Sequence, residues 1–600
     1  MIRRWNVKFF GAVLVLVLWH QPAIAQATAA LSGTVQGSSG AALSGVAVSV
    51  TSLETGVSRV TTTDGNGTFR VLSLPVGPLE VSAEKKNFKR TVRRGINLIV
   101  GQEAVVSLRL ELGNLKQEVT ISAASPLVNT TTDEVSGFVD ERAVKDLPLN
   151  GRSWDNLIAL NPGAVNFGLK SANTTTSNGN TFTVAGRRPM DNLVLLNGIE
   201  YTGASLVGVT PGGVSGGLLG IDAVREFNVL TDTYPPEYGK RSGGQISVVT
   251  QSGTNELHGT LFEFLRNSAM DARNYFDNGP VPPLRRNQFG GALGGPLQKD
   301  KLFIFGNYEA FRQSLSVSNV AVVPDTQARQ GFLPNAAGAY LPVANLDPFM
   351  LKYMSFWPMP NGPELTVDGR PSGAALSFNS PRQKVREDFG TVRSDYVAGV
   401  SDTFSFAYTV DDGDSLTPLA DPLFGSNLRL RNQVASAHEV HVFSPHVLNT
   451  FQAGFSRAAF NYDSFPLATF SPDTSFVQES GPGGLVISGG LTTTGLSAIT
   501  SAGPNNAANV LSHRNLFTWT DDVQISTGKH QIGAGIWFQR LQDNENSAST
   551  TLGQANFSSL QSFLRGTISN FNVTPNRTGL GWRTLLGAWY LDTRSGSGRT

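Results

Sequence analysis

The chain has 600 residues, enough for several domains, and 40% of them are hydrophobic, enough to bury cores. Only 16% are charged, below the usual quarter, whereas glycine is abundant at 64, which favours turn-rich β structure over helical bundles. The near-equal 47 basic and 46 acidic residues exclude a strongly basic nucleic-acid-binding face, and the lack of cysteine excludes disulfides, a thiol nucleophile and a Cys-ligated metal.

The first 25 residues have the pattern of a secretory signal peptide. A basic start, an apolar run and a small-residue site follow one another: Arg3, Arg4 and Lys8, then residues 9–19, then Ala23, Ile24 and Ala25. The apolar run is too short for a membrane-spanning helix, which needs about 20 residues. We expect cleavage between Ala25 and Gln26, which leaves 44 basic against 46 acidic residues, a net charge of −2.

Residues 30–113 are expected to form a β-sandwich, because short strands recur there with Gly, Asp or Asn turns between them. The strands are expected at Leu31–Val35, Val46–Ser52, Val57–Thr63, Gly67–Leu72, Leu79–Lys85 and Gln102–Leu110. A calcium loop starting at Asp64 would need Gly and Glu where Phe69 and Pro75 stand, so a tight hairpin turn is predicted. The ordered phrases GTV, GVAVSV and TDGNGTFRVLSLPVGPLEVSAEKKNF resemble the carboxypeptidase regulatory-like domain, a transthyretin-like sandwich.

Residues 133–255 mix helical and strand patterns, so we expect an α+β domain. Helices are expected at Glu141–Leu147 and Ser153–Leu160, and strands at Phe182–Ala185, Asn192–Leu196, Arg225–Leu230 and Gln245–Thr250. The glycine-rich stretches 203–220 and 239–244 are expected to be mobile loops. Ser215 lies in a G-x-S-x-G pattern, but the strand and helix that a hydrolase needs around its nucleophile are not indicated by the sequence.

From His258 onward, apolar and polar residues alternate with the period of two that is typical of transmembrane β-strands. In one such run, Phe404, Phe406, Tyr408 and Val410 share a face. A hairpin is expected from Asn287–Gly294 and Leu302–Arg312. A soluble array of β-sandwiches is the alternative, but its surface would carry more charge. His438, His441 and His446 do not predict a metal site, because 438 and 441 point to opposite faces of a strand and 446 falls in a turn.

Three ordered phrases cover the junction between these two regions: LPLNGRSWDNLIALNPG, EYGKRSGGQISVVTQSGTNELHGTLFEFLRN and RRNQFGGALGGPLQKDKLFIFGNYE. They resemble the plug-to-barrel junction of TonB-dependent outer-membrane receptors of the Oar-like branch. The resemblance implies a mainly β fold in the Gram-negative outer membrane, with an N-terminal β-sandwich, an α+β plug and a partial antiparallel transmembrane β-barrel. The expected divisions are a signal peptide at 1–25, the sandwich at 26–113, the plug at 114–255 and the first part of the barrel at 256–600.

The same resemblance suggests where the chain meets TonB and where its loops lie. Glu118, Val119, Thr120, Ile121, Ser122 and Ala123 are similar to a TonB box, which pairs with periplasmic TonB by adding a strand. An ordinary edge strand of the plug or sandwich explains these residues equally well. Short links at 401–402, 444–446 and 527–529 are expected to be periplasmic turns, and the stretches 278–284, 323–381 and 460–509 to be polar extracellular loops.

We expect the chain to be a fragment of a longer receptor. About ten strands are indicated after Asn255, the last at Trp582–Asp592, whereas receptors of this kind close with about 22. A plug of the 141 residues from Leu115 to Asn255 has a radius of gyration of about 14 Å, too large for a barrel of ten strands. An open sheet edge in lipid would cost several kcal/mol for each unpaired backbone group. Residues 594–600 also lack the aromatic final residue usual in such barrels.

The function implied is binding of an extracellular ligand and its energised uptake, with the TonB complex and outer-membrane lipid as partners. The sequence does not identify the ligand. Carbohydrate and peptide are the ligand classes considered, and nucleic acid is not expected. One alternative is an outer-membrane adhesion or surface-organisation protein on the same scaffold. Another is a carbohydrate-binding module on a membrane barrel, because transthyretin-like sandwiches resemble starch-binding folds. No catalytic triad, His-x-x-Glu zinc pair or phosphate loop in context is present in the sequence, so neither an enzyme nor a cofactor is predicted.

Overall fold

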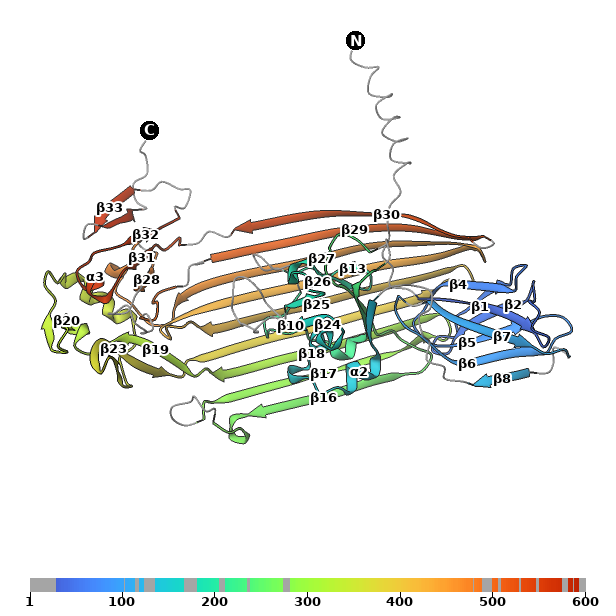
Figure 1. Ribbon diagram of the computed structural model, residues 1–600, viewed down its shortest axis with the longest axis horizontal. Coiled ribbons are helices and arrows are strands. Elements are labelled where there is room, and N and C mark those ends of the chain that lie inside the picture. The colour runs from blue at the N-terminus through green and yellow to red at the C-terminus, as the bar shows by residue number, and fades with distance from the viewer. Residues whose placement is uncertain are drawn as a thin grey trace, which may run out of the picture.

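The computed structural model describes residues 29–101, 103–113, 118–122, 135–166, 181–203, 211–234, 238–273, 281–477, 480–487, 499–504, 509–527, 530–546, 550–574, 581–585 and 588–592. A small β-sandwich lies at one end, a long sheet with an α+β segment beside it in the middle, and a group of short strands at the other end (Figure 1). No helix among the described residues is long and apolar enough to cross a membrane. The predicted cleavage site at Ala25 and Gln26 lies outside the described residues.

Two sheets form the β-sandwich, with strand orders β4-β1-β7 and β3-β2-β5-β6-β8. The bounds are β1 Ala29–Gly37, β2 Ala47–Ser52, β3 Ser58–Thr62, β4 Thr68–Leu74, β5 Gly77–Glu84, β6 Arg90–Leu98, β7 Glu103–Leu110 and β8 Glu118–Ser122. Every second side chain of β1 enters the shared core, as the pleat of a strand requires. All the expected strands are present, and β6 is one that the sequence pattern did not predict. The predicted turn at Asp64 is confirmed, since its Oδ1 accepts hydrogen bonds from the backbone N–H groups of Asn66 and Thr68 at 2.9 and 2.8 Å.

Residues 135–255, which we call the plug segment, are built on a sheet of order β13-β12-β15-β14-β9. The elements are β9 Val135–Val139, α2 Glu141–Asp146, η1 Asn150–Arg152, η2 Trp154–Leu160, β10 Ala164–Asn166, β11 Phe182–Val184, η3 Pro189–Asp191, β12 Leu193–Leu196, β13 Ile199–Glu200, η4 Ile221–Ala223, β14 Val224–Asp232 and β15 Gln245–Thr250. The Trp154 and Phe227 rings meet in its core, 5.5 Å apart. The predicted α+β character is confirmed, although the helix expected at 153–160 is a 3-10 helix.

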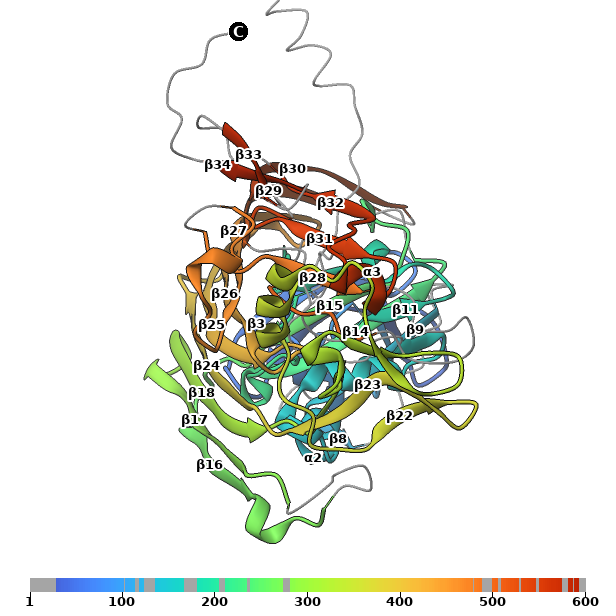
Figure 2. The same cartoon turned by 90° about the vertical axis from the view of Figure 1, so that its left-hand side faces the viewer.

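Nine antiparallel strands among the described residues form the long sheet, in the order β16-β17-β18-β24-β25-β26-β27-β29-β30. The bounds are β16 His258–Asn267, β17 Leu284–Gln298, β18 Leu302–Ser316, β24 Arg382–Val397, β25 Asp402–Pro418, β26 Phe424–Ser444, β27 Val447–Pro466, β29 Asn509–Thr527 and β30 His530–Asn546. The sheet curves around the plug segment (Figure 2). The predicted hairpin of β17 and β18 is confirmed. Phe404 and Phe406 point outward and are exposed, whereas Ala407 and Thr409 are buried on the inner side, so the predicted alternation is also confirmed.

Much of two stretches expected to be polar extracellular loops, 323–381 and the described part of 467–504, folds together with residues 554–572 into a compact unit, which we call the cap. Its elements are β19 Asn319–Pro324, η6 Ala328–Gln330, β20 Phe332–Pro334, β21 Tyr340–Pro342, η7 Pro348–Phe356, β22 Glu364–Val367, β23 Arg370–Asn379, η8 Pro472–Thr474, β28 Gly484–Ile487, β31 Gln554–Phe557, α3 Leu560–Leu564 and β32 Asn570–Asn572. Buried aromatic residues such as Phe356, Trp357 and Phe563 give the cap its own core. The cap lies at the end of the long sheet away from the sandwich (Figure 1).

Two further boundaries differ from those expected. β27 continues to Pro466, so the loop predicted from residue 460 begins later. The strand expected at Trp582–Asp592 is a separate hairpin of β33 Gly581–Leu585 and β34 Ala588–Asp592. A short helix, η5 Ser268–Met270, follows β16. Strands of 15 to 21 residues are longer than the about 9–11 needed to cross a bilayer, so β17, β18, β24, β25, β26, β27, β29 and β30 continue beyond it.

Candidate functional site: the plug segment and its contacts

Arg152 joins the plug segment to the first strands of the long sheet. Its guanidinium pairs with Asp222 of the plug segment and lies 3.5 Å from Oε1 of Glu309 on β18. It also stacks over the Phe262 ring of β16, 3.8 Å from the ring centroid. Glu309 is fully buried and accepts further hydrogen bonds from the Gln288 side chain and the Gly220 N–H, at 2.6 and 3.1 Å. Arg152 belongs to the LPLNGRS phrase of the sequence. The sequence therefore indicated this junction, but it did not indicate which residues Arg152 contacts.

The glycine-rich residues 211–220 form a second junction, with the middle of the long sheet. Oε2 of Glu387 accepts the Ser215 N–H at 2.6 Å, and Nδ2 of Asn432 donates to the Gly212 carbonyl at 3.2 Å. A Cβ at Gly213 would lie 2.0 Å from Oε1 of Glu387, so any side chain there would have to displace the Glu387 carboxylate. This part of the expected mobile loop is therefore closely packed and buried. Ser215 sits in this turn, and the next described helix along the chain is the three-residue η4.

Glu200, which is 4% exposed, organises a third junction near the last strands of the sheet. It pairs with Lys240 and, at 2.9 Å, with Arg241, and Lys240 also donates to Oε1 of Gln539 on β30 at 2.7 Å. Further contacts run from the plug segment to β27 and β29: Gln452 to the Asn197 carbonyl at 2.6 Å and Arg514 to the Gly203 carbonyl at 3.3 Å. The plug segment is thus held to the sheet by polar contacts distributed from β16 to β30.

The sandwich is tied to the plug segment through Arg225 and Glu226. Arg225 donates two hydrogen bonds to the Glu54 carboxylate, and the Val100 N–H donates to Oε1 of Glu226 at 2.6 Å. Burial raises the pKa of the Glu226 carboxyl to about 7, although the Val100 N–H and the charge of Arg225 favour its ionised form. Neither residue was singled out from the sequence, because their partners lie more than a hundred residues away.

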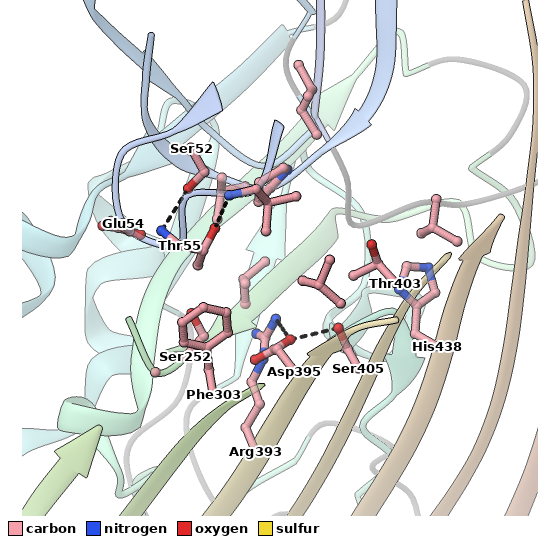
Figure 3. A pocket seen from close by; sticks show the side chains of 18 of the residues that line it. Ser52, Glu54, Thr55, Ser252, Phe303, Arg393, Asp395, Thr403, Ser405 and His438 are labelled. Atoms are coloured by element: carbon pink, nitrogen blue, oxygen red, sulfur yellow. Dashed lines mark hydrogen bonds and ion pairs between the residues drawn. The ribbon is translucent and has the colours of Figure 1, made fainter. Parts of the chain in front are cut away.

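Two cavities accompany this contact. One, of about 170 Å³, lies where the sandwich, the plug segment and the long sheet meet (Figure 3). Arg393 reaches its wall from β24, pairs with Asp395 at 2.9 Å, and donates to the Thr250 carbonyl of the plug segment at 2.8 Å. His438 lines the same cavity from β26. The other cavity, of about 390 Å³, lies between the sandwich and α2 and is lined by charged residues that include Glu54, Arg225 and Glu226.

The segment similar to a TonB box lies in strand β8, Glu118–Ser122, and Ala123 lies outside the described residues. β8 runs parallel to β6, from Arg90 opposite Glu118 to Arg94 opposite Ser122. It is the last strand in the order of its sheet, and β3 is the first. The backbone edge of β8 away from β6 therefore pairs with no other described strand.

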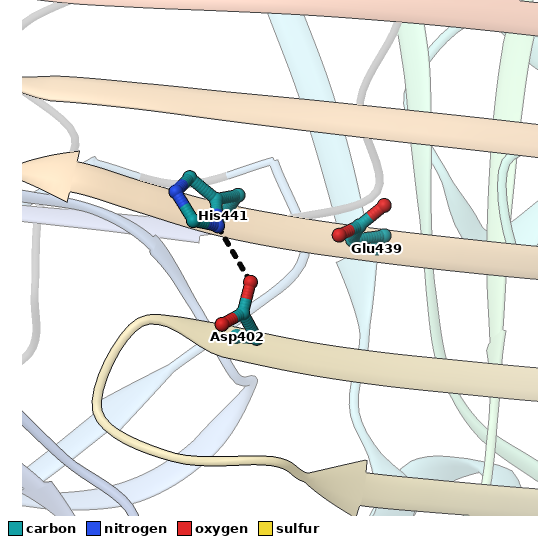
Figure 4. Close-up of side chains that lie close together, drawn as sticks. All are labelled: Asp402, Glu439 and His441. Carbon is teal, nitrogen blue, oxygen red and sulfur yellow. Dashed lines mark hydrogen bonds and ion pairs between the residues drawn. The ribbon is translucent and has the colours of Figure 1, made fainter.

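Asp402, Glu439 and His441 meet on the outer face of the long sheet, at the end near the sandwich (Figure 4). One ligand atom of each lies within 4.8 Å of the others, which is close enough to hold a metal ion. Nδ1 of His441 forms a hydrogen bond of 2.5 Å with Oδ1 of Asp402, a contact that needs no metal. His438 and His441 do face opposite sides of β26, as predicted. The sequence did not reveal the acidic neighbours, because Asp402 reaches His441 only through the pairing of β25 with β26.

Comparison with known proteins agrees with this architecture. Residues 249–592 match the family model of the outer membrane beta barrel domain, and residues 30–111 match that of the carboxypeptidase regulatory-like domain. The first match covers more than half of the chain, so the chain belongs to the outer-membrane β-barrel family and is an outer-membrane protein.

The chain is similar to the TonB-dependent transporter Oar of Myxococcus xanthus, with 28% identity over 310 residues. That similarity covers 49% of this chain and 27% of Oar, so the chain spans about a quarter of the length of this relative. Among solved structures, the outer membrane transporter YddB from Escherichia coli has a TM-score of 0.45 at 11% identity, covering 71% of this chain and 50% of YddB. The ferric yersiniabactin uptake receptor FyuA from Yersinia pestis has a TM-score of 0.38 at 11% identity, covering 69% of this chain and 61% of FyuA.

Proposed function

We propose that this protein is a TonB-dependent outer-membrane receptor that binds an extracellular ligand and admits it when TonB, from the periplasm, displaces the plug segment. The observation that carries the proposal is the set of polar contacts between the plug segment and the long sheet, centred on Glu309, Glu387 and Glu200. Intramolecular hydrogen bonds can be exchanged for hydrogen bonds to water at a modest net cost, about 1.5–3 kcal/mol each where one partner is charged. Such an interface suits a segment that must shift. Similarity to the Oar transporter supports the same assignment.

The proposed division of labour follows the chain. Residues 1–25 direct export, 26–113 form the periplasmic sandwich, 114–255 the plug and 256–600 the part of the barrel contained in this chain. The ligand would be bound at the cap side, because the cap is a folded unit with its own core at the opposite end from the sandwich. The proposal assigns no covalent chemistry and no cofactor to the chain.

TonB would pair with β8 by strand addition. β8 offers one backbone edge to β6 and the other to a partner, and backbone pairing of this kind places little demand on side chains. Since the chain has no cysteine, a single introduced cysteine is its only thiol. Thr120→Cys places that thiol in the middle of β8, and Val60→Cys places it on β3, at the opposite edge of the same sheet.

The test is disulfide formation in the periplasm with TonB that carries one cysteine in its C-terminal domain. We expect a cross-link with Thr120→Cys and none with Val60→Cys, whose side chain is 60% exposed and therefore accessible. Deletion of residues 118–123 should abolish energised uptake and leave the amount of protein in the outer membrane unchanged. Equal cross-linking at both positions, or none at Thr120→Cys, would contradict TonB pairing at β8.

The cap also favours a second candidate, an adhesion or surface-organisation protein, because a folded unit at the outer end can bind another surface without any transport. The two functions separate in cells that carry the deletion of 118–123. Loss of energised uptake with unchanged cell adhesion supports the receptor. Loss of adhesion after removal of the cap, in a strain where the 118–123 deletion has no uptake phenotype, supports the rival. A glycan array with the intact protein tests the carbohydrate-binding alternative.

A further inference from the structure

Four buried oxygen atoms between the long sheet and the plug segment have, among the described residues, no hydrogen-bond partner outside their own group. They are Oε1 of Glu387, Oδ2 of Asp411, Oδ1 of Asn432 and the hydroxyl of Tyr201. Each of these side chains is at most 4% exposed. Buried polar atoms almost always have a partner, and two carboxyl groups in contact cannot hydrogen-bond each other while both are ionised, so this group points to a bound species that satisfies the four oxygens together.

The fold brings the four side chains together from separate strands. Asp411 on β25 is directly opposite Asn432 on β26, and Glu387 on β24 is opposite Gly413, so it is the diagonal neighbour of Asp411. All three face the plug segment. The carboxyl groups of Glu387 and Asp411 lie within hydrogen-bonding reach of each other, and so do the Tyr201 hydroxyl, just after β13, and the Asn432 side chain.

This place carries acidic groups that no basic side chain neutralises. Among the described residues, no Lys or Arg forms an ion pair with Glu387 or Asp411. Arg152 is engaged with Asp222 and Glu309, and Arg386 pairs with Asp388, Asp412 and Asp414 on the outer face of the sheet. Residues 204–210, which follow Tyr201 closely in the chain, contain no Lys, Arg or His. Buried carboxylates are ordinarily paired with a cation or coordinate a metal.

We propose that Glu387, Asp411, Asn432 and Tyr201 bind a divalent cation of the calcium class. All the donors are oxygen atoms, the preference of hard cations, whereas zinc and copper favour nitrogen or sulfur ligands. The two carboxylates match the charge of a divalent ion. If both bind through two oxygens, the four side chains supply about six ligands, within the range for calcium.

The cation would connect three strands of the long sheet to the plug segment. Tyr201 belongs to the plug segment. Two of the other proposed ligands already contact that segment: Glu387 accepts the Ser215 N–H, and Asn432 donates to the Gly212 carbonyl. Removal of the cation would leave the two carboxylates to repel each other at that contact. The seating of the plug segment would then depend on divalent cations, a property separate from pairing with TonB.

The test uses the intact protein purified from outer membranes in detergent, stripped of metal with a chelator and titrated with terbium, which replaces calcium and luminesces when a nearby tyrosine absorbs light. We expect terbium luminescence that calcium displaces. Asp411→Asn should weaken terbium binding by roughly 10-fold or more, because affinity at such sites depends on the number of charged ligands. Asp412→Asn, on the same strand but on its outer face, should bind as the unaltered protein does. Tyr201→Phe should lose most of the luminescence while still binding calcium.

Metal analysis of the unaltered protein keeps the proposal testable even if a variant fails to fold. Bound calcium that the chelator removes, together with a lower thermal unfolding temperature after removal, would support the site. Three results would overturn it: no calcium and no terbium signal in the unaltered protein, equal binding by Asp411→Asn and Asp412→Asn, or luminescence that Tyr201→Phe leaves intact. If the unaltered protein binds neither calcium nor terbium, the carboxyl groups of Glu387 and Asp411 share a proton instead.

Discussion

Arg225 of the plug segment and Glu54 of the sandwich form a two-pronged ion pair, with N–O distances of 2.8 and 2.9 Å between the guanidinium and the carboxylate. The two residues are 171 positions apart, and Arg225 is only 9% exposed. Beside this pair, the Asn255 N–H donates to the Glu54 carbonyl at 2.8 Å. Glu54 therefore holds the sandwich to the plug segment at two points, Arg225 and Asn255, the last residue of that segment.

Loss of the Arg225 guanidinium should release the sandwich. Arg225→Met leaves the Glu54 carboxylate without its partner, and we expect a cost of roughly 2–3 kcal/mol, less than the 3–5 of a fully buried pair because Glu54 is 26% exposed. Thermal unfolding and the rate at which trypsin frees the sandwich would measure it. Arg142→Met, which removes an arginine that is 88% exposed on α2, is the control and should have no measurable effect.

The contact between sandwich and plug segment should weaken as pH rises through neutrality. The folded pKa of Glu226 is raised to about 7, above the ordinary value of 4.5, so the folded state holds a proton that the unfolded state releases. The stabilisation is fully present below about 4.5 and is lost as pH rises through about 7, a change of about 3 kcal/mol. Unfolding temperatures measured from pH 5 to 8 should fall less in Glu226→Gln than in the unaltered protein. Parallel curves for the two proteins would contradict the assignment to Glu226.

Gly213 should not tolerate a side chain. In Gly213→Ala the new methyl group would displace the carboxylate of Glu387, and with it the hydrogen bond to Ser215, at a cost of about 1–3 kcal/mol. Gly239→Ala is the matched control, because a Cβ there meets no atom within 4 Å. Thermal unfolding of both variants in detergent gives the comparison. Equal stability of the two would mean that residues 211–217 do not pack against β24.

A charge on the outer face of the long sheet should be costly in the membrane. Phe406, 49% exposed, lies in the apolar band of β25 between Phe404 and Val410, so we expect Phe406→Arg to destabilise the protein by about 2–4 kcal/mol in lipid. Val400→Arg changes a residue that is 93% exposed in the turn before β25 and should cost about 1 kcal/mol or less. Urea unfolding in lipid vesicles would measure both. Equal stability of the two variants would place the membrane elsewhere along the strand.

The parts of the fold that sequence predicted are those set by neighbouring residues. The hairpin of β17 and β18 follows from two alternating runs and the turn between them. These features can be recognised within a short, continuous stretch of sequence. Strand β6 was missed because its outer side carries Arg93, Arg94 and Asn97, which dilute the β pattern.

The candidate sites depend on contacts that local pattern does not encode. Asp411 lies opposite Asn432, and Asp402 opposite His441, only because β25 and β26 pair in one particular register. The cap was read as polar loops because its apolar residues, among them Phe356 and Trp357, have no regular period. From the sequence, Gly213 and Gly220 were expected to lie in a mobile loop. In the structure, Gly213 allows the close approach of a glutamate from the long sheet, and Gly220 that of a phenylalanine.

The order of strands has a mechanical consequence. β8 ends at Ser122 and β9 begins at Val135, so twelve residues separate them, a tether of at most about 40–45 Å when fully extended. A pull on β8 would be carried along these residues to β9, an outermost strand of the plug sheet, which pairs with β14 alone in that sheet. Load applied at an outermost strand peels a sheet one strand at a time. The plug segment would therefore yield from β9 inward, with β14 next, and β12 and β13 at the far edge of the sheet would keep their pairing until last.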